Sequence, residues 1–230
     1  AGPEMRFEKP DSLPVEDFGN WLLENLEHIT REDAIKAAVD LWETDTGIYP
    51  HLDRVDDHGT FFRMAAQHNG LICQSIPGDL DLIRTLNLPA IFELLVPDGS
   101  SRGYMTVKKM EGETVTLAAG RLDPIVVSLK EVKTFWTGVA LVPWKNFLSY
   151  TGVIPKSAPR DSVVTLKIML TDMGFSDITV DPEYDATTRK AVKKIQAKHG
   201  IKPDGVVGPL TKIILYNEHG SFKIPHIRAN

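Results

Sequence analysis

The chain has 230 residues and a mass of 25.6 kDa, and its 42% hydrophobic and 25% charged residues are typical of a folded protein with a buried core. A net charge of −5 argues against nucleic acid as the main ligand, because nucleic-acid binders normally present a strongly basic face. No run approaches the roughly 18 consecutive apolar residues that would span a bilayer, and the single cysteine, Cys73, excludes an internal disulfide.

The first part of the chain is predicted to be helical after an extended arm. Residues 1–16 hold three prolines among charges and are predicted to form the arm. A start without Met is expected of a fragment of a longer protein or of a tag remnant. Thr30, with Asp33 three residues later, predicts a helix start. The spacing of apolar residues predicts three helices, over residues 21–29, 30–47 and 58–70.

The hydrophobic period changes after the third helix. Short β-prone runs divided by Gly, Pro, Asp and Ser predict six strands, at residues 71–73, 90–95, 104–107, 114–117, 125–127 and 138–142. A short helix is predicted between Ser128 and Trp136. Helices followed by a sheet indicate an α+β fold for this part of the chain.

Residues 151–160 hold two prolines and a glycine with few bulky apolar residues, which predicts a linker between a domain at 1–150 and a second at 161–230. The net charge changes at the same place, from −7 for residues 1–160 to +2 for the remainder.

The second domain is predicted to be a bundle of three short helices. Asp161 is expected to cap the first helix, which ends by Gly174. Asp185 is expected to cap the second, over 186–199, and Pro209 to open the third, over 210–216.

The second domain also resembles the bacterial peptidoglycan-binding domain. The family pattern D-x-x-T-x-x-A-V-x-x-F-Q-x-x-x-G-L, then D-G-x-x-G-x-x-T, is matched at Asp185, Thr188, Ala191, Val192, Gln196, Gly200, Asp204, Gly205, Gly208 and Thr211. Three positions depart from the pattern: Ile195 replaces the usual Phe, Ile201 replaces the usual Leu, and Lys167 replaces a frequent Gln. The resemblance spans Asp161 to about Asn217 and implies binding to the cell wall.

Most of these positions also have a structural explanation, since Asp185 suits a helix cap, and the Asp204-Gly205 pair suits a turn. Cationic side chains could pair with stem-peptide carboxylates, and planar amides suit sugar hydroxyls. The candidate peptidoglycan-binding residues are therefore Asp185, Thr188, Arg189, Lys193, Gln196, Asp204 and Thr211.

The larger domain resembles the papain-like peptidase domain with which bacteriocin exporters trim leader peptides. The resemblance rests on L-N-L-P-A-I at 86–91 and W-T-G-V-A-L at 136–141, and covers about residues 30–145. An active member needs a Cys nucleophile, a His base and an Asp or Asn that orients the His. The positions expected for these groups carry Asp33-Ala34, Gly103-Tyr104 and Leu117-Ala118-Ala119-Gly120. We therefore predict an inactive peptidase domain with no catalytic residues.

Other chemistry in the larger domain is not favoured. Cys73 lies in an apolar run, where a cysteine usually behaves as a small hydrophobe. The spacing of the nearby histidines, His51, His58 and His68, matches no zinc pattern. An acidic cluster at Asp53, Asp56 and Asp57 is most simply a solvated loop, with a weak cation site as the alternative. We expect no metal and no cofactor.

The order of the two domains resembles the periplasmic part of the GspA/ExeA assembly ATPases of type II secretion. This resemblance implies a periplasmic region of an inner-membrane protein that binds peptidoglycan, self-associates and, with a partner secretion protein, helps to assemble the secretin. Any ATPase activity would lie in a domain absent from this chain. A wall-anchored hydrolase or peptidase with an unrecognised active site is the alternative, and a nucleic-acid binder using residues 189–198 is disfavoured by the acidic net charge.

Overall fold

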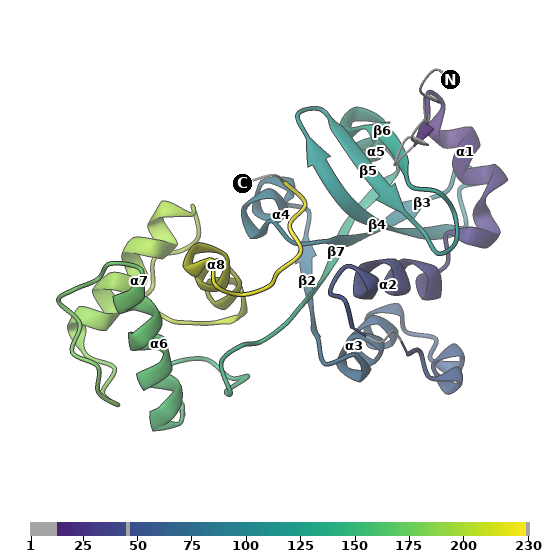
Figure 1. The fold of residues 1–230 in the computed structure, drawn as a ribbon. Helices are drawn as coiled ribbons and strands as arrows, with labels where there is room; N and C mark the ends of the chain where they lie inside the picture. Colours follow the sequence, from purple (N-terminus) through teal and green to yellow (C-terminus); the bar gives the residue numbers. More distant parts are fainter. Residues whose placement is uncertain (1–12, 45–46, 229–230) are drawn as a thin grey trace, which may run out of the picture.

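The structure is a computed structural model and describes residues 13–44 and 47–228 (Figure 1). Most of the predicted N-terminal arm therefore lies outside the described residues. None of the helices that the structure describes is long and apolar enough to cross a membrane.

The first two thirds of the described chain form a seven-stranded sheet with the order β1-β6-β5-β4-β3-β7-β2. All neighbouring strands are antiparallel except β1 and β6. The strands are β1 (Leu13–Pro14), β2 (Ile72–Pro77), β3 (Ala90–Leu95), β4 (Arg102–Glu111), β5 (Thr114–Ala118), β6 (Ile125–Ser128) and β7 (Trp136–Trp144). The α+β prediction and all six predicted strands are confirmed, and β1 is an additional edge strand.

Helices cover both faces of this sheet, and we call the elements from β1 to β7 the large domain. The helices are α1 (Phe18–Glu24), α2 (Arg31–Asp40), α3 (His58–His68), α4 (Leu80–Leu86) and α5 (Leu129–Phe135), with 3-10 turns at Leu26–His28 and Pro50–Arg54. Thr30 caps α2 as predicted, because its side chain accepts a hydrogen bond from the N–H of Asp33. Figure 1 shows α2 and α3 on one side of the sheet and α1 and α5 on the other.

The alternation of side chains along the central strands produces two cores. On β3, Ile91 packs with α2 and α3, whereas its neighbour Phe92 packs with the core on the other face. Tyr104 and Met105 divide in the same way on β4. Successive residues of a strand point to opposite faces, so a continuous apolar run can serve both cores.

The remaining helices, α6 (Arg160–Asp172), α7 (Ala186–Lys198) and α8 (Pro209–His219), form the predicted three-helix bundle, which we call the small bundle. Asp185 caps α7 as expected. Asp161 does not cap α6, so that prediction is wrong: the carbonyl of Pro159 already accepts the N–H of Ser162 at 3.0 Å, and the helix begins at Arg160. The third helix also runs beyond Tyr216, because Gly220 provides its left-handed C-cap.

The predicted linker at 151–160 is packed onto the small bundle. Ile154 is fully buried and exchanges two backbone hydrogen bonds with Val207, at 3.1 and 2.8 Å. The side chain of Lys212, itself buried, donates to the carbonyls of Tyr150 and Gly152. The limits assigned to the two domains from the sequence stay a prediction.

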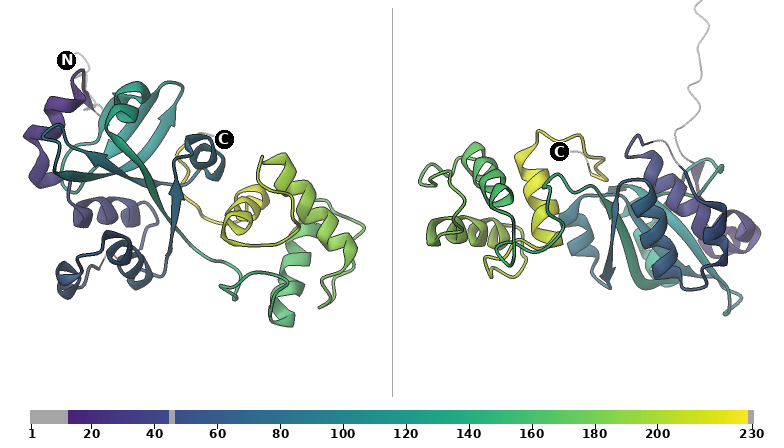
Figure 2. Two further views of the ribbon diagram at one scale, coloured as in Figure 1. Left: turned by 180° about the vertical axis from the view of Figure 1, so that it is seen from behind. Right: turned by 90° about the horizontal axis from the view of Figure 1, so that it is seen from below.

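The end of the described chain returns to the large domain. Residues 221–228, the C-terminal segment, run from α8 to a position beside α4 (Figures 1 and 2). The N–H of Met110 on β4 donates to the carbonyl of Ile227 at 2.7 Å, and Ile227 is fully buried. Aromatic rings add a second connection, since the rings of Phe147, Tyr216 and Phe222 contact one another, with the centroid of Phe147 5.1 Å from Tyr216 and 4.3 Å from Phe222.

Candidate functional site

The small bundle carries a hollow of about 280 Å³ at the start of α8. Mostly apolar walls with a few convergent polar groups are typical of ligand sites. The hollow, which we call the α8 groove, is lined by Val153, Gln196, Ile201, Lys202, Asp204, Val206, Gly208, Pro209, Leu210 and Thr211. Three of the seven candidate residues, Gln196, Asp204 and Thr211, thus lie together.

Gln196 is the central support of this groove. Its side chain is 1% exposed, and its amide nitrogen lies 3.1 Å from Asp204 Oδ1, 2.9 Å from the carbonyl of Val206 and 3.1 Å from Thr211 Oγ1. Its Oε1 accepts the N–H of Gly205 at 2.8 Å. Because these bonds fasten the turn to both α7 and α8, Gln196 shapes the groove from below.

Asp204 is exposed at the edge of the groove. Its Oδ1 accepts the N–H of Val206 at 2.9 Å, and this hydrogen bond lowers the pKa of the carboxyl. Asp204 is therefore ionised at neutral pH and can accept hydrogen bonds from a ligand.

Arg189 and Lys193 lie behind the turn and do not line the groove. Gly205 has φ +72°, and a Cβ at this position would lie 2.6 Å from Cγ of Arg189. Arg189 also lies over the ring of Tyr184, whose hydroxyl donates to the carbonyl of Gly205 at 2.7 Å. The stems of both cationic side chains support the turn, and the two residues are exposed.

Asp185 and Thr188 lie toward the other end of α7, about 16 and about 12 Å from Gln196 by helix length. The carboxylate of Asp185 accepts the N–H of Thr188 at 2.7 Å and pairs with the buried ammonium of Lys167 at 3.0 Å. These contacts lower the pKa of Asp185 to about 2. Thr188 is fully buried. The structure thus does not bring these two residues to the groove.

The sequence prediction missed the apolar part of the groove. Val206 and Leu210 occupy positions of the family pattern at which no residue type is specified, between Asp204 and Thr211. Val153 had no sequence signal, because it reaches the groove only through the pairing of Ile154 with Val207.

In the large domain, the three segments expected to carry peptidase chemistry do meet. The hydroxyl of Thr106 on β4 donates to the carbonyl of Ala34 on α2 at 2.6 Å. The N–H of Gly120, after β5, donates to the carbonyl of Asp33 at 3.2 Å. The segments in which a nucleophile, a base and an orienting acid were sought, around Ala34, Tyr104 and Gly120, therefore lie close together.

Tyr104, in the segment where the base was expected, is held in place by hydrogen bonds and packing. Its hydroxyl donates to Glu93 Oε2 at 3.0 Å, and burial raises the pKa of the phenol, which stays protonated. Its backbone N–H donates to the carbonyl of Ile29 at 2.7 Å. A Cβ on the preceding Gly103 would overlap the side chain of Ile29, so the chain before α2 packs directly on β4.

Cys73 lies on β2, which β7 and β3 separate from β4 in the sheet, a distance of about 14 Å. Burial raises the pKa of its thiol to about 12, so the thiolate is scarce at neutral pH. Among the described residues, no three His, Cys, Asp or Glu side chains are arranged to hold a metal ion. Asp57 of the acidic cluster caps α3 by accepting the N–H of Thr60 at 2.7 Å.

Comparisons with known proteins agree with this division. Residues 159–215 match the family described as putative peptidoglycan binding domain, and residues 57–147 match the peptidase C39 family. A protein of Escherichia coli K12, described as putative general secretion pathway protein A, is 26% identical over 157 residues. That match covers 66% of this chain and 30% of the relative, so the chain spans about a third of the length of that protein.

A solved structure extends the similarity over most of the chain. It is a periplasmic domain of the EpsAB fusion protein of the Vibrio vulnificus type II secretion system, with a TM-score of 0.53 and 16% identity, covering 86% of this chain and 82% of that one. The fold of most of this chain is thus similar to that of the EpsAB domain. The chain has the domain pair of a GspA/ExeA-type region.

The residues covered by the two family matches can be compared with the peptidase segments and with the α8 groove. The peptidase C39 match begins at residue 57, after α2, and so leaves out Asp33 and Ala34. The general secretion pathway relative and the EpsAB domain are both described as secretion proteins. The peptidoglycan-binding match contains Gln196, Asp204 and Thr211 and most of the lining of the α8 groove.

Proposed function

We propose that this chain binds peptidoglycan through the small bundle and serves type II secretion as a non-enzymatic, wall-binding region. The observation that carries the proposal is the α8 groove, which is held open by Gln196 inside the segment that matches the peptidoglycan-binding family. Its apolar walls suit the faces of sugar rings, and the carboxylate of Asp204 and the hydroxyl of Thr211 suit polar groups of the wall.

The large domain is, in this proposal, a peptidase fold that has lost its chemistry. Ala34, Tyr104 and Gly120 supply no nucleophile, no base and no orienting acid, and a phenol held by Glu93 is a poor proton acceptor at neutral pH. We assign to this domain the contacts with further copies or with a partner secretion protein. Self-association raises the avidity for the wall, because later contacts become intramolecular.

The same comparisons support a periplasmic location for this region as part of an inner-membrane protein. The EpsAB domain is described as periplasmic, and peptidoglycan is the ligand implied by the small bundle. Help in assembling the secretin is the role we infer for the complete protein.

Sedimentation with purified sacculi tests the binding. We expect the chain to sediment with sacculi and to release no soluble muropeptides. Leu210→Glu, which places a charge in the groove wall, should weaken binding to sacculi about 10-fold or more. Ile168→Glu, at an exposed position of α6, should not weaken it. Thermal unfolding of both variants verifies that each is folded. Equal sedimentation of Leu210→Glu and wild type would remove the groove from the proposal.

The wall-hydrolase alternative has its own measurable result. Release of soluble muropeptides by the wild type, persisting in Cys73→Ala, would show that an unrecognised active site exists. Chemical crosslinking and sedimentation velocity of the whole chain, with and without sacculi, test self-association. A single monomeric species under both conditions would contradict the avidity mechanism.

A further inference from the structure

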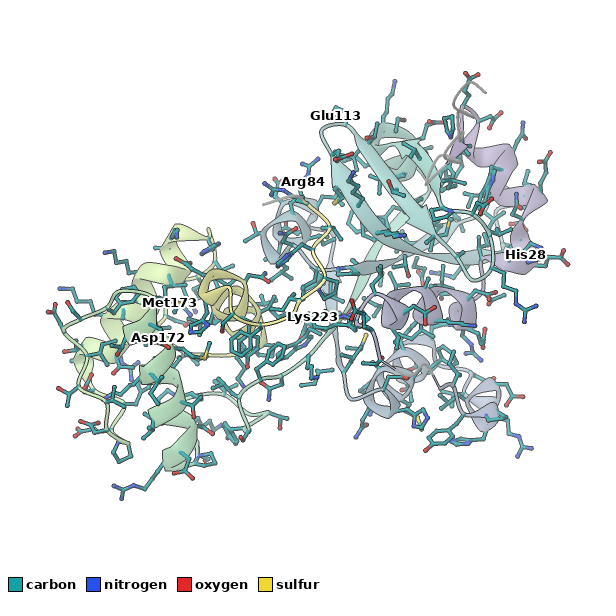
Figure 3. All side chains as sticks on the ribbon, in the orientation of Figure 1. His28, Arg84, Glu113, Asp172, Met173 and Lys223 are labelled. Carbon is teal, nitrogen blue, oxygen red and sulfur yellow. The ribbon has the colours of Figure 1, made fainter. Side chains whose placement is uncertain are left out.

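A second and larger hollow, of about 580 Å³, lies where the small bundle meets the large domain. We call it the interdomain groove. Its walls come from the end of α4, the end of α7, the exposed side of α8 and the C-terminal segment, with the principal residues Arg84, Asn87, Lys198, His199, Glu218 and Arg228. Figure 3 labels Arg84, which lies on α4 beside the C-terminal segment.

The backbone acceptors at this end of α4 are already occupied. Asn217 donates its side-chain amide to the carbonyl of Leu86 at 2.7 Å. The guanidinium of Arg228 donates to the carbonyl of Arg84 at 3.4 Å, and the N–H of Ile227 donates to the carbonyl of Asn87 at 3.3 Å. Because these carbonyls are used within the protein, the groove mainly offers donors to a ligand.

The charge of the groove opposes that of the whole chain. Three cationic side chains, Arg84, Lys198 and Arg228, line it together with one carboxylate, Glu218, so its formal charge is +2 in a chain of −5. Glu218 pairs with Lys198 and with His199, at 2.7 Å from the latter. Arg84 has an exposed partner, Asp81, at the long distance of 3.4 Å. The two guanidinium groups are thus the principal donors presented to a ligand.

We propose that the interdomain groove binds the carboxylates of peptidoglycan stem peptides. This inference rests on the proposed function and adds a wall contact that neither domain forms alone. Guanidinium groups bind carboxylates through two parallel hydrogen bonds, and each such pair adds both affinity and geometric selectivity. The groove has room for a short peptide rather than for a single ion.

The two grooves are arranged for two separate contacts with the wall. Gln196 supports the α8 groove, and Lys198, two residues later on α7, lines the interdomain groove. Residues two apart lie on nearly opposite sides of a helix. The grooves therefore face different directions around the end of α7, and neighbouring stem peptides of the wall, rather than one peptide, would occupy them.

The test uses paired charge removals on the whole chain. Arg84→Gln with Arg228→Gln removes both guanidinium groups from the groove, and Arg121→Gln with Arg160→Gln removes two from exposed positions, one in each domain. We expect the first pair to weaken binding to sacculi about 10-fold or more and the second to have no effect, because a charged hydrogen bond contributes roughly a factor of ten. Lys198→Gln, tested alone, should show an intermediate loss.

Sacculi with amidated carboxyl groups identify the ligand chemistry. Wild type should bind them as weakly as the Arg84→Gln, Arg228→Gln variant binds unmodified sacculi, and that variant should lose nothing further. Equal binding of this variant and wild type to unmodified sacculi would overturn the inference and leave the proposed function intact. Calorimetric titration with a soluble disaccharide tetrapeptide gives an independent measurement. No difference between wild type and variant in that titration would also overturn the inference, whereas no sedimentation of wild type would contradict the proposed function.

Discussion

The backbone N–H of Met110 donates to the carbonyl of Ile227 across 2.7 Å, so the end of the described chain pairs with a strand of the large domain. Ile227 is fully buried there, although 117 positions separate the two residues along the sequence. The C-terminal segment is therefore part of the core of the large domain and connects it to the small bundle.

Loss of the Ile227 side chain should uncouple the two domains. Ile227→Ala removes a buried aliphatic side chain, and we expect a loss of about 2–4 kcal/mol in the free energy of unfolding. Calorimetry should show one transition for wild type and two for Ile227→Ala. Ile168→Ala, on an exposed position of α6, is the control and should change the free energy by less than about 0.5 kcal/mol. An unchanged single transition in Ile227→Ala would show that the aromatic contacts suffice.

The turn that forms the α8 groove should tolerate no side chain at Gly205. Gly205 and Gly200 have nearly the same φ, +72° and +69°, but only at Gly205 would a Cβ meet other atoms, at 2.6 Å from Arg189 Cγ. Gly200→Ala should cost about 1 kcal/mol from backbone strain alone. Gly205→Ala should cost about 2–3 kcal/mol, because steric overlap is added, and should also weaken binding to sacculi. Equal losses in urea unfolding would contradict the contact with Arg189.

The carboxylate of Asp185, which accepts the N–H of Thr188 and pairs with Lys167, should give acid-sensitive stability. The pKa of Asp185 is lowered to about 2 in the folded state, from about 3.9 in an unfolded chain. Its stabilising contribution is therefore complete above pH 4 and is lost as the pH falls from about 4 through 2. Asp185→Asn should lower the urea midpoint at pH 7 and reduce the slope of stability between pH 4 and 2. Asp177→Asn, at an exposed position, should follow the wild-type profile.

Cys73 should react slowly in the folded protein. The raised pKa of its thiol, about 12, leaves little thiolate at pH 8, so alkylation by iodoacetamide should be at least 10-fold slower than in urea. Cys73→Ser should bind sacculi as wild type does. Rapid alkylation of the native protein would show that the thiol is activated and would revive the enzymatic alternative.

Local sequence signals predicted most elements of the fold. Caps such as Thr30 and Asp185 act within three residues, and the alternation along β3 and β4 arises from the strands themselves, so both are visible in the sequence. α4 was missed although Asp79 caps it by accepting the N–H of Leu82 at 2.8 Å, because seven residues are too few for a clear helical period.

Features that depend on distant pairing were not predictable. β1 has two residues and exists only through its pairing with β6. The packing of Ile227 against β4 likewise depends on the completed sheet. For the candidate site, the sequence predicted the cluster of Gln196, Asp204 and Thr211 through the family pattern. The family pattern did not separate these from Asp185 and Thr188, although the predicted helix over 186–199 already places those two residues near its start.

The buried Ile227 and the stacked rings of Phe147 and Phe222 connect the small bundle to the large domain. A glycan strand held in the α8 groove would therefore determine the orientation of the large domain's sheet as well as its position. Copies held on parallel glycan strands would all have the same orientation. They would therefore be aligned with one another before any two of them come into contact.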